Sequence, residues 1–458
     1  MEGVTLSIAL VLSVLIFLVS PVYGLIIYIA SLVWYPSYLT VSLGTIDFTM
    51  RRITILALLA NLYLQTNLPG RFKYKWLDIL VICYFVAQIV SGVFTTPIMK
   101  LLENRAGAVF DMVLPYFAVR MIVTNKQQYL MILKAILFIS APLAIVGFYQ
   151  CLTGYNPVGF LIKYHGWSEV RSAGYVALFR KGFFRANVTF SVSGMFGFFF
   201  AMFGAVCAGF LRNVKKYKFV YIICIGLMAV GVFSSMSSGP MLVSLLAVLF
   251  MAFYRYRRCW KIVLVALVLI CGMVEFISNR HFYDVLGDFT IKPQTAWFRS
   301  RLIEVALFEG GMSGHWLLGF GYGVEPGWST KIDGREFTDI VNHYLLILCR
   351  FGLVALVPWL AMNVAAIKEL INAYKTTNSD SNRWLIWCLG AGFFGLSCGL
   401  MSISLFEQST TVFYMMIGFA GVMPAVVART KANLCTTPTY PFQNTYSRGM
   451  YVMLNRNL

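Results

Sequence analysis

The chain has 458 residues, of which 59% are hydrophobic and only 12% are charged, and its formal net charge is +19. Soluble domains carry about 25% charged residues, so this composition excludes an ordinary soluble protein and predicts an integral membrane protein. The ten cysteines include no CxxC pair, which argues against a zinc site or a disulfide framework.

Apolar stretches long enough to cross a bilayer recur along the whole chain. A membrane-spanning helix needs about 20 mainly apolar residues, and the mean hydropathy of +0.75 is high enough for many such helices. We predict an all-α polytopic integral membrane protein with about 12–13 transmembrane helices and two long external loops. The predicted spans are 4–20, 22–41, 46–66, 76–94, 107–123, 129–149, 187–211, 218–236, 240–254, 262–278, 340–361, 384–404 and 410–428.

Short basic connectors between these spans predict the orientation of the chain. Lys and Arg are enriched in cytoplasmic loops, and each pair of connectors is separated by an even number of spans, so we expect all of them in the cytoplasm. Thirteen spans would place the N-terminus outside and Arg51 and Arg52 near the external face, whereas a half-inserted segment among the first three would give twelve. The connectors are RFKYK (71–75), RNVKKYK (212–218), RYRRCWK (255–261) and the linker with Lys368, Lys375 and Arg383.

The predicted spans and loops divide the chain into six regions. Loops longer than about 12–15 residues are usually functional or disordered, and two of these regions are long external loops. The regions are N-terminal transmembrane helices (1–149), a basic external loop (150–186), central transmembrane helices (187–278), a large external loop (279–339), C-terminal transmembrane helices (340–428) and a cytoplasmic tail (429–458).

The first external loop carries an excess of basic residues on the side where Lys and Arg are disfavoured. Arginine suits phosphate because its fork donates two parallel hydrogen bonds and keeps its charge. Arg180 and Lys181 could instead reach lipid headgroups, whereas Arg185 stands just before an apolar span, where a buried charge is expensive. In the second loop, TAWFRSRLIEVAL (295–307) adds Arg299 and Arg301. We therefore expect an anionic partner at the external face.

His343 stands at the head of a predicted span, in FTDIVNHYLLILCRFG (337–352). Histidine is the side chain best suited to general base work near neutral pH. Asp339 precedes it by four residues, which on a helix would place both on one face and let the carboxylate orient the ring. The alternatives are a structural histidine and an acid that favours a helix start.

The remaining motifs mainly exclude kinds of binding site. The glycine run GFGYG (319–323) has no surrounding βαβ unit, so it predicts a tight turn with close backbone packing rather than a dinucleotide site. No DxD, HExxH or Walker A sequence occurs, and the acids of the second loop show no spacing typical of metal ligands. We therefore expect neither a metal nor a cofactor.

These residues resemble the bacterial O-antigen polymerase and O-antigen ligase family (Wzy and WaaL type), and are closest to exopolysaccharide repeat-unit polymerases. Unlike many members, this chain has no arginine in the turn before Pro240, and its Asn342 precedes His343 where the usual order is His before Asn. The resemblance is carried by Arg185 before a span, the turn FSSMSSGP (233–240), the segment from Thr295 to Arg301, HWLLGFGYG (315–323) and DIVNHYLLILCRFGLVAL (339–356).

The resemblance implies a GT-C-like glycosyltransferase that joins undecaprenyl-diphosphate-linked repeat units in the bacterial inner membrane, with its site facing the periplasm. Its catalytic residues would be His343, as the group that deprotonates or polarises the acceptor hydroxyl, and Arg185 with Arg299 or Arg301, which would hold the departing diphosphate. The substrate contacts implied are Arg180, Lys181, Asp339, Asn342, Tyr344 and Trp297.

The same resemblance implies the partners. They are the lipid-linked glycan donor, a glycan acceptor and membrane lipid, with a chain-length regulator and a flippase, and no nucleic acid. Two alternatives stay open. An O-antigen ligase would transfer the glycan to a lipid A core. A lipid or glycan transporter would show broken helices in paired halves and charge in mid-membrane, for which Asp111 and Lys134 are the main candidates.

Overall fold

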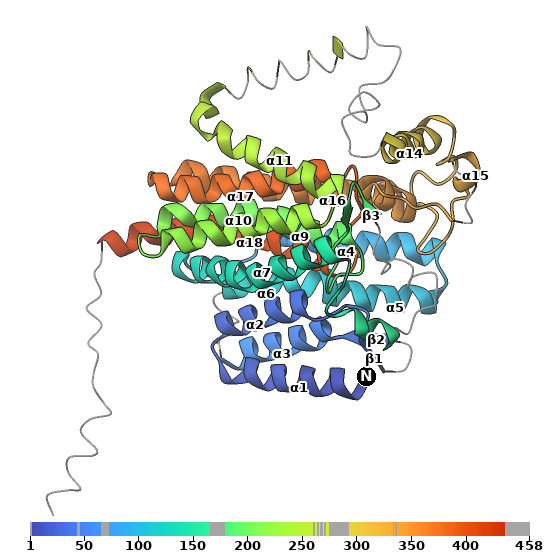
Figure 1. Ribbon diagram of the computed structural model, residues 1–458. Helices are drawn as coiled ribbons and strands as arrows, with labels where there is room; N and C mark the ends of the chain where they lie inside the picture. Colours follow the sequence, from blue (N-terminus) through green and yellow to red (C-terminus); the bar gives the residue numbers. More distant parts are fainter. Residues whose placement is uncertain are drawn as a thin grey trace, which may run out of the picture.

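In the computed structural model, the chain folds into a bundle of long helices that lie side by side (Figure 1). The structure describes residues 2–43, 46–65, 73–164, 179–259, 293–332 and 337–435, together with Gly334 and a few single positions between 262 and 273. The predicted span 262–278 lies almost entirely outside the described residues. So do parts of both predicted external loops, at 165–178 and 279–292, and the tail from residue 436.

The N-terminal part of the chain combines helices with a short hairpin. Strands β1 and β2 pair antiparallel, with Thr40 opposite Thr49, and they occupy the ends of the predicted spans 22–41 and 46–66. Both helices are therefore shorter than predicted, because the β-branched residues of this junction favour extended backbone. The elements are α1 (Glu2–Leu18), α2 (Pro21–Trp34), β1 (Thr40–Leu43), β2 (Ile46–Thr49) and α3 (Met50–Gln65).

The next four helices include one bent segment. The predicted span 107–123 is only the second half of this segment, which begins at Ile98 and passes through a π-helical turn. The long helix that follows is capped by Asn125, whose side chain accepts a hydrogen bond from the backbone of Gln128, and it ends at Gly154 in the left-handed conformation. The elements are α4 (Trp76–Thr95), α5 (Ile98–Ala108), η2 (Val109–Val113), α6 (Leu114–Ile122) and α7 (Lys126–Thr153).

The remaining elements begin with a second hairpin. The central ones are the 3₁₀ turn η3 (Gly159–Tyr164), β3 (Phe179–Arg180), β4 (Phe183–Phe184), α9 (Ser193–Ala208) continued by η5 (Gly209–Asn213), α10 (Lys218–Ser234) and α11 (Ser238–Ala252) continued by η6 (Phe253–Cys259). The C-terminal ones are α14 (Pro293–Ile303), η7 (Glu304–Phe308), α15 (Ser329–Ile332), α16 (His343–Thr376), α17 (Asp380–Gly399) and α18 (Gln408–Cys435).

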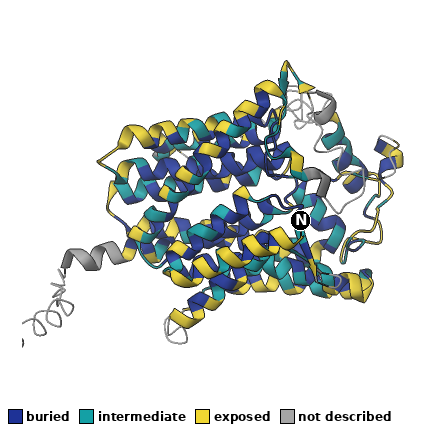
Figure 2. Cartoon of the chain, turned by 60° about the horizontal axis from the view of Figure 1, so that its bottom comes forward, coloured by how far each residue is buried: buried dark blue, intermediate teal, exposed yellow. Residues whose placement is uncertain are grey.

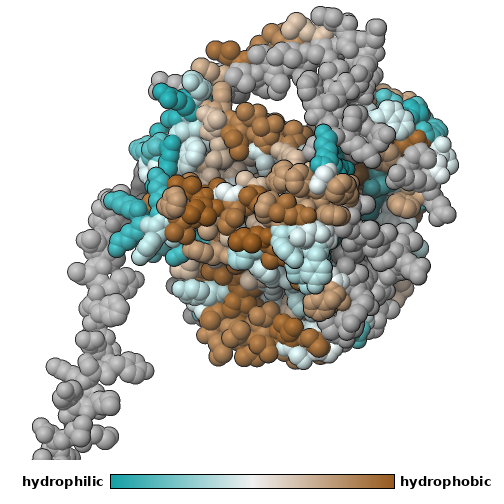
Figure 3. Space-filling model, in the orientation of Figure 1, coloured by the Kyte–Doolittle hydropathy of each residue, from teal (hydrophilic) through white to brown (hydrophobic). Residues whose placement is uncertain are grey.

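Six helices of the described chain are long and apolar enough to cross a membrane, and three shorter apolar helices accompany them. Apolar side chains cover the middle of the surface in Figure 3, while hydrophilic ones gather at its left end. The protein is therefore a multi-pass helical membrane protein. The six are Trp76–Thr95, Lys126–Thr153, Ser193–Asn213, Ser238–Arg257, His343–Thr376 and Gln408–Ala428.

Helix α9 forms the centre of the bundle. Fifteen of its sixteen residues are buried, as expected for a helix that is apolar on every side. Its phenylalanines Phe196, Phe199, Phe200 and Phe203 pack edge to face in succession. The surrounding helices turn their buried faces inward and their exposed faces outward (Figure 2). Arg185 lies eight residues before this central helix.

The basic connectors meet at one end of the bundle. Lys75, at the start of α4, forms an ion pair of 2.6 Å with Glu369 near the end of α16. Arg212 of η5 pairs with Asp380 at the start of α17 at 2.7 Å. Helices α14 and α15, the short α5 and both hairpins lie at the opposite end (Figure 1). This second end corresponds to the predicted external face.

Helix α16 is broken at Gly352, whose backbone has φ 66° and ψ −167°. A loop from the region before it enters the break and replaces the missing helical hydrogen bonds. The amides of Phe320 and Gly321 donate to the carbonyls of Cys349 (2.7 Å) and Arg350 (3.1 Å), and two further bonds run from α16 back to the loop. Only such substitution makes irregular backbone tolerable inside a membrane protein. The predicted tight turn at GFGYG is confirmed, with positive φ at Gly319, Gly321 and Gly323.

Candidate functional site

The first predicted basic loop presents its arginines on the hairpin β3–β4. Lys181 and Gly182 form the turn of the hairpin, both with positive φ, and Lys181 is exposed. Arg180 donates a hydrogen bond of 3.0 Å to the carbonyl of Met236. The amide of Ala186 donates one of 2.9 Å to Ser234. The hairpin is therefore fastened to the turn between α10 and α11.

Three arginines from the two predicted external loops gather beside this hairpin. Burial, together with the positive charge of Arg180, lowers the pKa of Arg185 to about 10. Burial likewise lowers the pKa of Arg299, which Arg180 also lowers and Asp339 raises. Because Arg180 acts on both of the others, the three guanidinium groups share one region. We call Arg180, Arg185 and Arg299 the arginine triad.

The charge of the triad is not neutralised by direct pairing. Among the residues that the structure describes, no ion pair is formed between a carboxylate and Arg180, Arg185 or Arg299, although the negative charge of Asp339 acts on Arg299. The Nε atoms of Arg185 and Arg299 are buried without a hydrogen-bond partner. Buried donors are normally satisfied, so these two point to a ligand that accepts hydrogen bonds and carries negative charge.

Arg301 lies only two residues beyond Arg299 but has a different environment. Its guanidinium pairs with Glu304 at 3.1 Å and with Glu309 at 2.5 Å, inside its own segment. These acids neutralise its charge. Of the two arginines predicted in this segment, the structure brings Arg299, and not Arg301, to the triad.

His343 is the first residue of α16. Its Nδ1 accepts a hydrogen bond of 3.3 Å from the backbone amide of Leu405, and its own amide donates to the carbonyl of Leu400 at 2.8 Å. A neutral ring that accepts at Nδ1 carries its proton on Nε2. Asp339 precedes the helix, so the prediction that it shares a helical face with His343 is wrong. The ring is oriented by a main-chain amide rather than by a carboxylate.

The segment 399–406 connects His343 to the arginine hairpin. It holds His343 through Leu400 and Leu405 on one side. On the other side, Gly194 packs against both Ile403 and Ser237 of the turn that anchors Arg180. His343 and the turn that anchors Arg180 are therefore linked through this segment and lie at the same end of the bundle.

The other predicted contacts divide into structural and accessible residues. Asn342 caps α16, since its side chain accepts a hydrogen bond from the amide of Leu345 at 3.2 Å. Tyr344 donates to the carbonyl of Ser397 at 2.8 Å and packs edge to face on Trp359. Trp297, in contrast, is 56% exposed on α14, next to Arg299. Of the three, only Trp297 presents a free face on which a sugar ring could stack.

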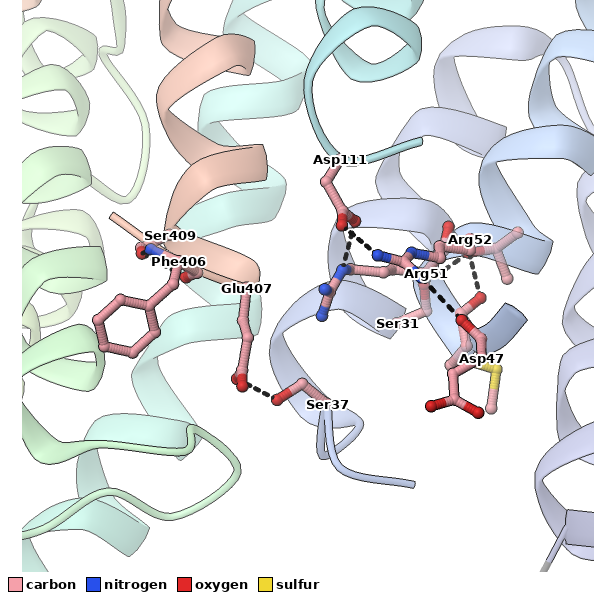
Figure 4. A network of polar contacts seen from close by, with 11 residues as sticks. Ser31, Ser37, Asp47, Arg51, Arg52, Asp111, Phe406, Glu407 and Ser409 are labelled. Atoms are coloured by element: carbon pink, nitrogen blue, oxygen red, sulfur yellow. Dashed lines mark hydrogen bonds and ion pairs between the residues drawn. The ribbon is translucent and has the colours of Figure 1, made fainter. Parts of the chain in front are cut away.

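A buried ionic network at this end was not recognised as a unit in the sequence (Figure 4). Asp111 accepts hydrogen bonds from Arg51 at 2.9 Å and Arg52 at 2.7 Å. Nearby, Glu407 accepts one of 2.5 Å from Ser37. The sequence contained a signal for this pairing, because two arginines near the predicted external face and an aspartate in an apolar span carry opposite charges. The pairing accounts for the mid-span Asp111 and for arginines on the external side.

The donor set of this end consists of arginine, histidine and main-chain groups. In the described part of the chain, no group of three or more His, Cys, Asp or Glu side chains is arranged to hold a metal ion. An unneutralised arginine triad beside an oriented histidine can bind a polyanion and polarise a neighbouring hydroxyl. Compared with known proteins, the chain matches no protein-family model and shows no significant similarity to a curated protein.

Proposed function

We propose that this protein is a polysaccharide polymerase with a GT-C-like architecture. It would join undecaprenyl-diphosphate-linked oligosaccharide repeat units at the external face of a bacterial inner membrane, without a metal. The observation that carries the proposal is the arginine triad: two half-buried arginines with unsatisfied Nε donors and a third whose charge acts on both, contributed by two loops of a membrane protein. Such a group suits a diphosphate that is presented at the membrane surface.

The reaction would be a direct glycosyl transfer. The hydroxyl oxygen of the acceptor sugar attacks the anomeric carbon of the donor, and the bond from that carbon to the diphosphate oxygen breaks. The electron pair leaves with the diphosphate, and the hydroxyl proton ends on the diphosphate or in water. Arg185 and Arg299 would stabilise the negative charge that develops on the leaving group. Preorganised donors lower the free energy of a transition state most strongly where charge develops.

His343 would act on the acceptor rather than on the diphosphate. With its proton on Nε2, the neutral ring donates a hydrogen bond and orients the acceptor hydroxyl. Proton abstraction by the same atom would require the other tautomer and the loss of the Leu405 hydrogen bond. The geometry thus favours a polarising role over that of a general base.

The O-antigen ligase alternative uses the same donor chemistry with a lipid A core as acceptor, so it shares the triad. The transporter alternative gains one point of support, since α16 is a broken helix. However, the unneutralised charge lies at one end of the bundle, and the mid-span Asp111 is paired. An enzyme therefore remains the better proposal.

The test is a reaction of the purified protein with a synthetic undecaprenyl-diphosphate-linked repeat unit in the presence of EDTA. We expect a ladder of products, and we expect Arg185→Ala to lower the rate about 100-fold, the typical loss when one preorganised donor is removed. A rate that depends on added divalent metal, or an Arg185→Ala variant at full rate, would contradict the proposal.

A matched pair of variants separates site chemistry from local charge. Arg299→Ala and Arg301→Ala each remove one arginine from α14. Because Arg301 is already neutralised by Glu304 and Glu309, we expect its loss to reduce the rate far less than the loss of Arg299. Equal losses would show that the segment acts through its overall charge. Transfer to a lipid A core without a ladder would identify the ligase instead.

A further inference from the structure

A second unneutralised pair of arginines lies where α5 approaches the break in α16. Arg105 of α5 and Arg350 of α16 stack on the same ring, that of Tyr322, with their Cζ atoms 5.9 Å and 4.9 Å from its centroid. Arg105 also lies 5.0 Å from the ring of Phe351. Tyr322 belongs to the glycine-rich loop, so this loop holds both guanidinium groups at the break.

The pair lacks the partners that a purely structural arginine usually has. Arg105 is only 8% exposed. Its Nη1 donates to the side chain of Gln88, but its Nε is buried without a hydrogen-bond partner. In the described chain, neither Arg105 nor Arg350 forms an ion pair with a carboxylate. A buried arginine beside a second, half-buried one is costly, and an anion that accepts hydrogen bonds would relieve this cost.

The position of the pair relates it to His343. Arg350 follows His343 by seven residues on α16, which is about two turns at 3.6 residues per turn, so both side chains emerge from the same face of the helix. The segment before the break is helical from His343 onward, and the charge of Arg350 acts on the ring of His343. Segment 399–406 therefore links His343 to the turn that holds Arg180 of the triad, and Arg350 lies two turns further along α16.

We propose that Arg105 and Arg350 form a second phosphate-binding site, which holds the lipid-linked diphosphate of the acceptor. This inference rests on the proposed function, since a polymerase joins two substrates that both carry a polyprenyl diphosphate. The triad binds the diphosphate that leaves, and the Arg105–Arg350 pair binds the one that is retained. The acceptor sugar then lies between the two sites, next to His343.

The test counts binding sites without relying on turnover. The full-length protein is placed in phosphatidylcholine nanodiscs, and the probe is radiolabelled undecaprenyl diphosphate without a glycan. We expect two molecules bound per chain in the wild type, one in Arg350→Gln, one in Arg185→Gln and none in the double variant. Arg105→Gln should weaken the second site at least tenfold. Arg257→Gln is the matched control, since Arg257 stacks on Tyr254 at the opposite end of the bundle and should leave both sites intact.

The outcomes separate this inference from the proposed function. One site in the wild type, removed by Arg185→Gln and unaffected by Arg350→Gln, would overturn the second site and leave the polymerase proposal standing. No binding in the wild type would overturn both. Phosphatidylglycerol or inorganic phosphate added as competitor identifies the source of the phosphate. If either displaces the probe from the Arg350-dependent site as well as undecaprenyl diphosphate does, that site serves another phosphate and the acceptor assignment fails.

Discussion

At the scale of single residues, ion pairing separates two kinds of arginine in this protein. Arg51 and Arg52 both pair with Asp111, and Arg301 pairs with two glutamates, so carboxylates within the fold neutralise the charge of each. Arg105 is buried and Arg185 is half-buried, and each has a buried Nε without a hydrogen-bond partner. A buried arginine that pairs with a carboxylate stabilises the structure. One without such a partner is a candidate for binding an anion.

The Asp111 network gives a stability prediction at this scale. Replacing Asp111 by Asn removes the carboxylate from two arginines that are largely buried. We expect the free energy of unfolding to fall by about 3–5 kcal/mol, the usual consequence of leaving a buried charge unpaired. Thermal unfolding of the purified protein in detergent would measure it.

Asp380→Asn is the matched control for this prediction. Asp380 also pairs with an arginine, but its side chain is 68% exposed, and such surface pairs contribute about 1 kcal/mol or less. A loss at Asp111 no larger than the loss at Asp380 would show that the Asp111 network is not a buried ionic cluster.

At the scale of elements, the broken helix α16 organises the site. The loop that fills the break also carries Tyr322, which stacks on Arg105 and Arg350. The sequence predicted a tight turn at GFGYG, because glycine adopts positive φ angles without strain and three glycines alternate there. The break itself could not be predicted, because LLILCRFGLVAL (345–356) is apolar apart from Arg350 and lies within one predicted span, 340–361. It depends on hydrogen bonds supplied by a loop elsewhere in the chain.

Gly352→Ala tests the break directly. At φ 66° and ψ −167° the backbone is in a region that is almost restricted to glycine, and alanine there costs on the order of 1–3 kcal/mol. Its Cβ would also collide with the carbonyl of Leu317. We expect a less stable protein whose glycine-rich loop is cut faster by an added protease.

Gly390→Ala serves as the control within a neighbouring helix. Gly390 lies in α17, and a Cβ there meets open space, so this change should leave the stability unchanged or raise it by about 0.5–1 kcal/mol. If Gly352→Ala behaved in the same way, α16 would not need its break.

At the scale of the whole molecule, the two ends of the bundle have different chemistry. One end gathers the basic connectors, which are tied together by the Lys75–Glu369 and Arg212–Asp380 pairs. The other carries the triad, His343 and the Asp111 network. The sequence predicted this difference between the two ends, since each pair of basic connectors is separated by an even number of predicted spans. It could not predict that Arg180 and Arg299 meet, because their loops are far apart in the chain and only the tertiary packing joins them.

This polarity predicts the accessibility of two inserted epitope tags. One tag follows Gly310, in the loop region after α14, and the other follows Lys216, in the connector before α10. We expect an antibody to reach the first tag in intact spheroplasts and the second only after permeabilisation, since basic connectors stay in the cytoplasm. The reverse pattern, or equal access to both tags, would contradict the orientation. The wild-type chain with a tag at neither place controls for background.

The break in α16 also has a consequence for biosynthesis. Four main-chain groups of this helix, the carbonyls of Cys349 and Arg350 and the amides of Leu353 and Val354, find their partners only in residues 316–321. Inside hydrocarbon, each of these groups would cost several kcal/mol without a partner. Helix α16 is therefore not a self-sufficient unit of membrane insertion, and the chain has to complete it with a loop that was synthesised earlier. In the finished protein, that loop is as much a part of the helix as the residues on either side of the break.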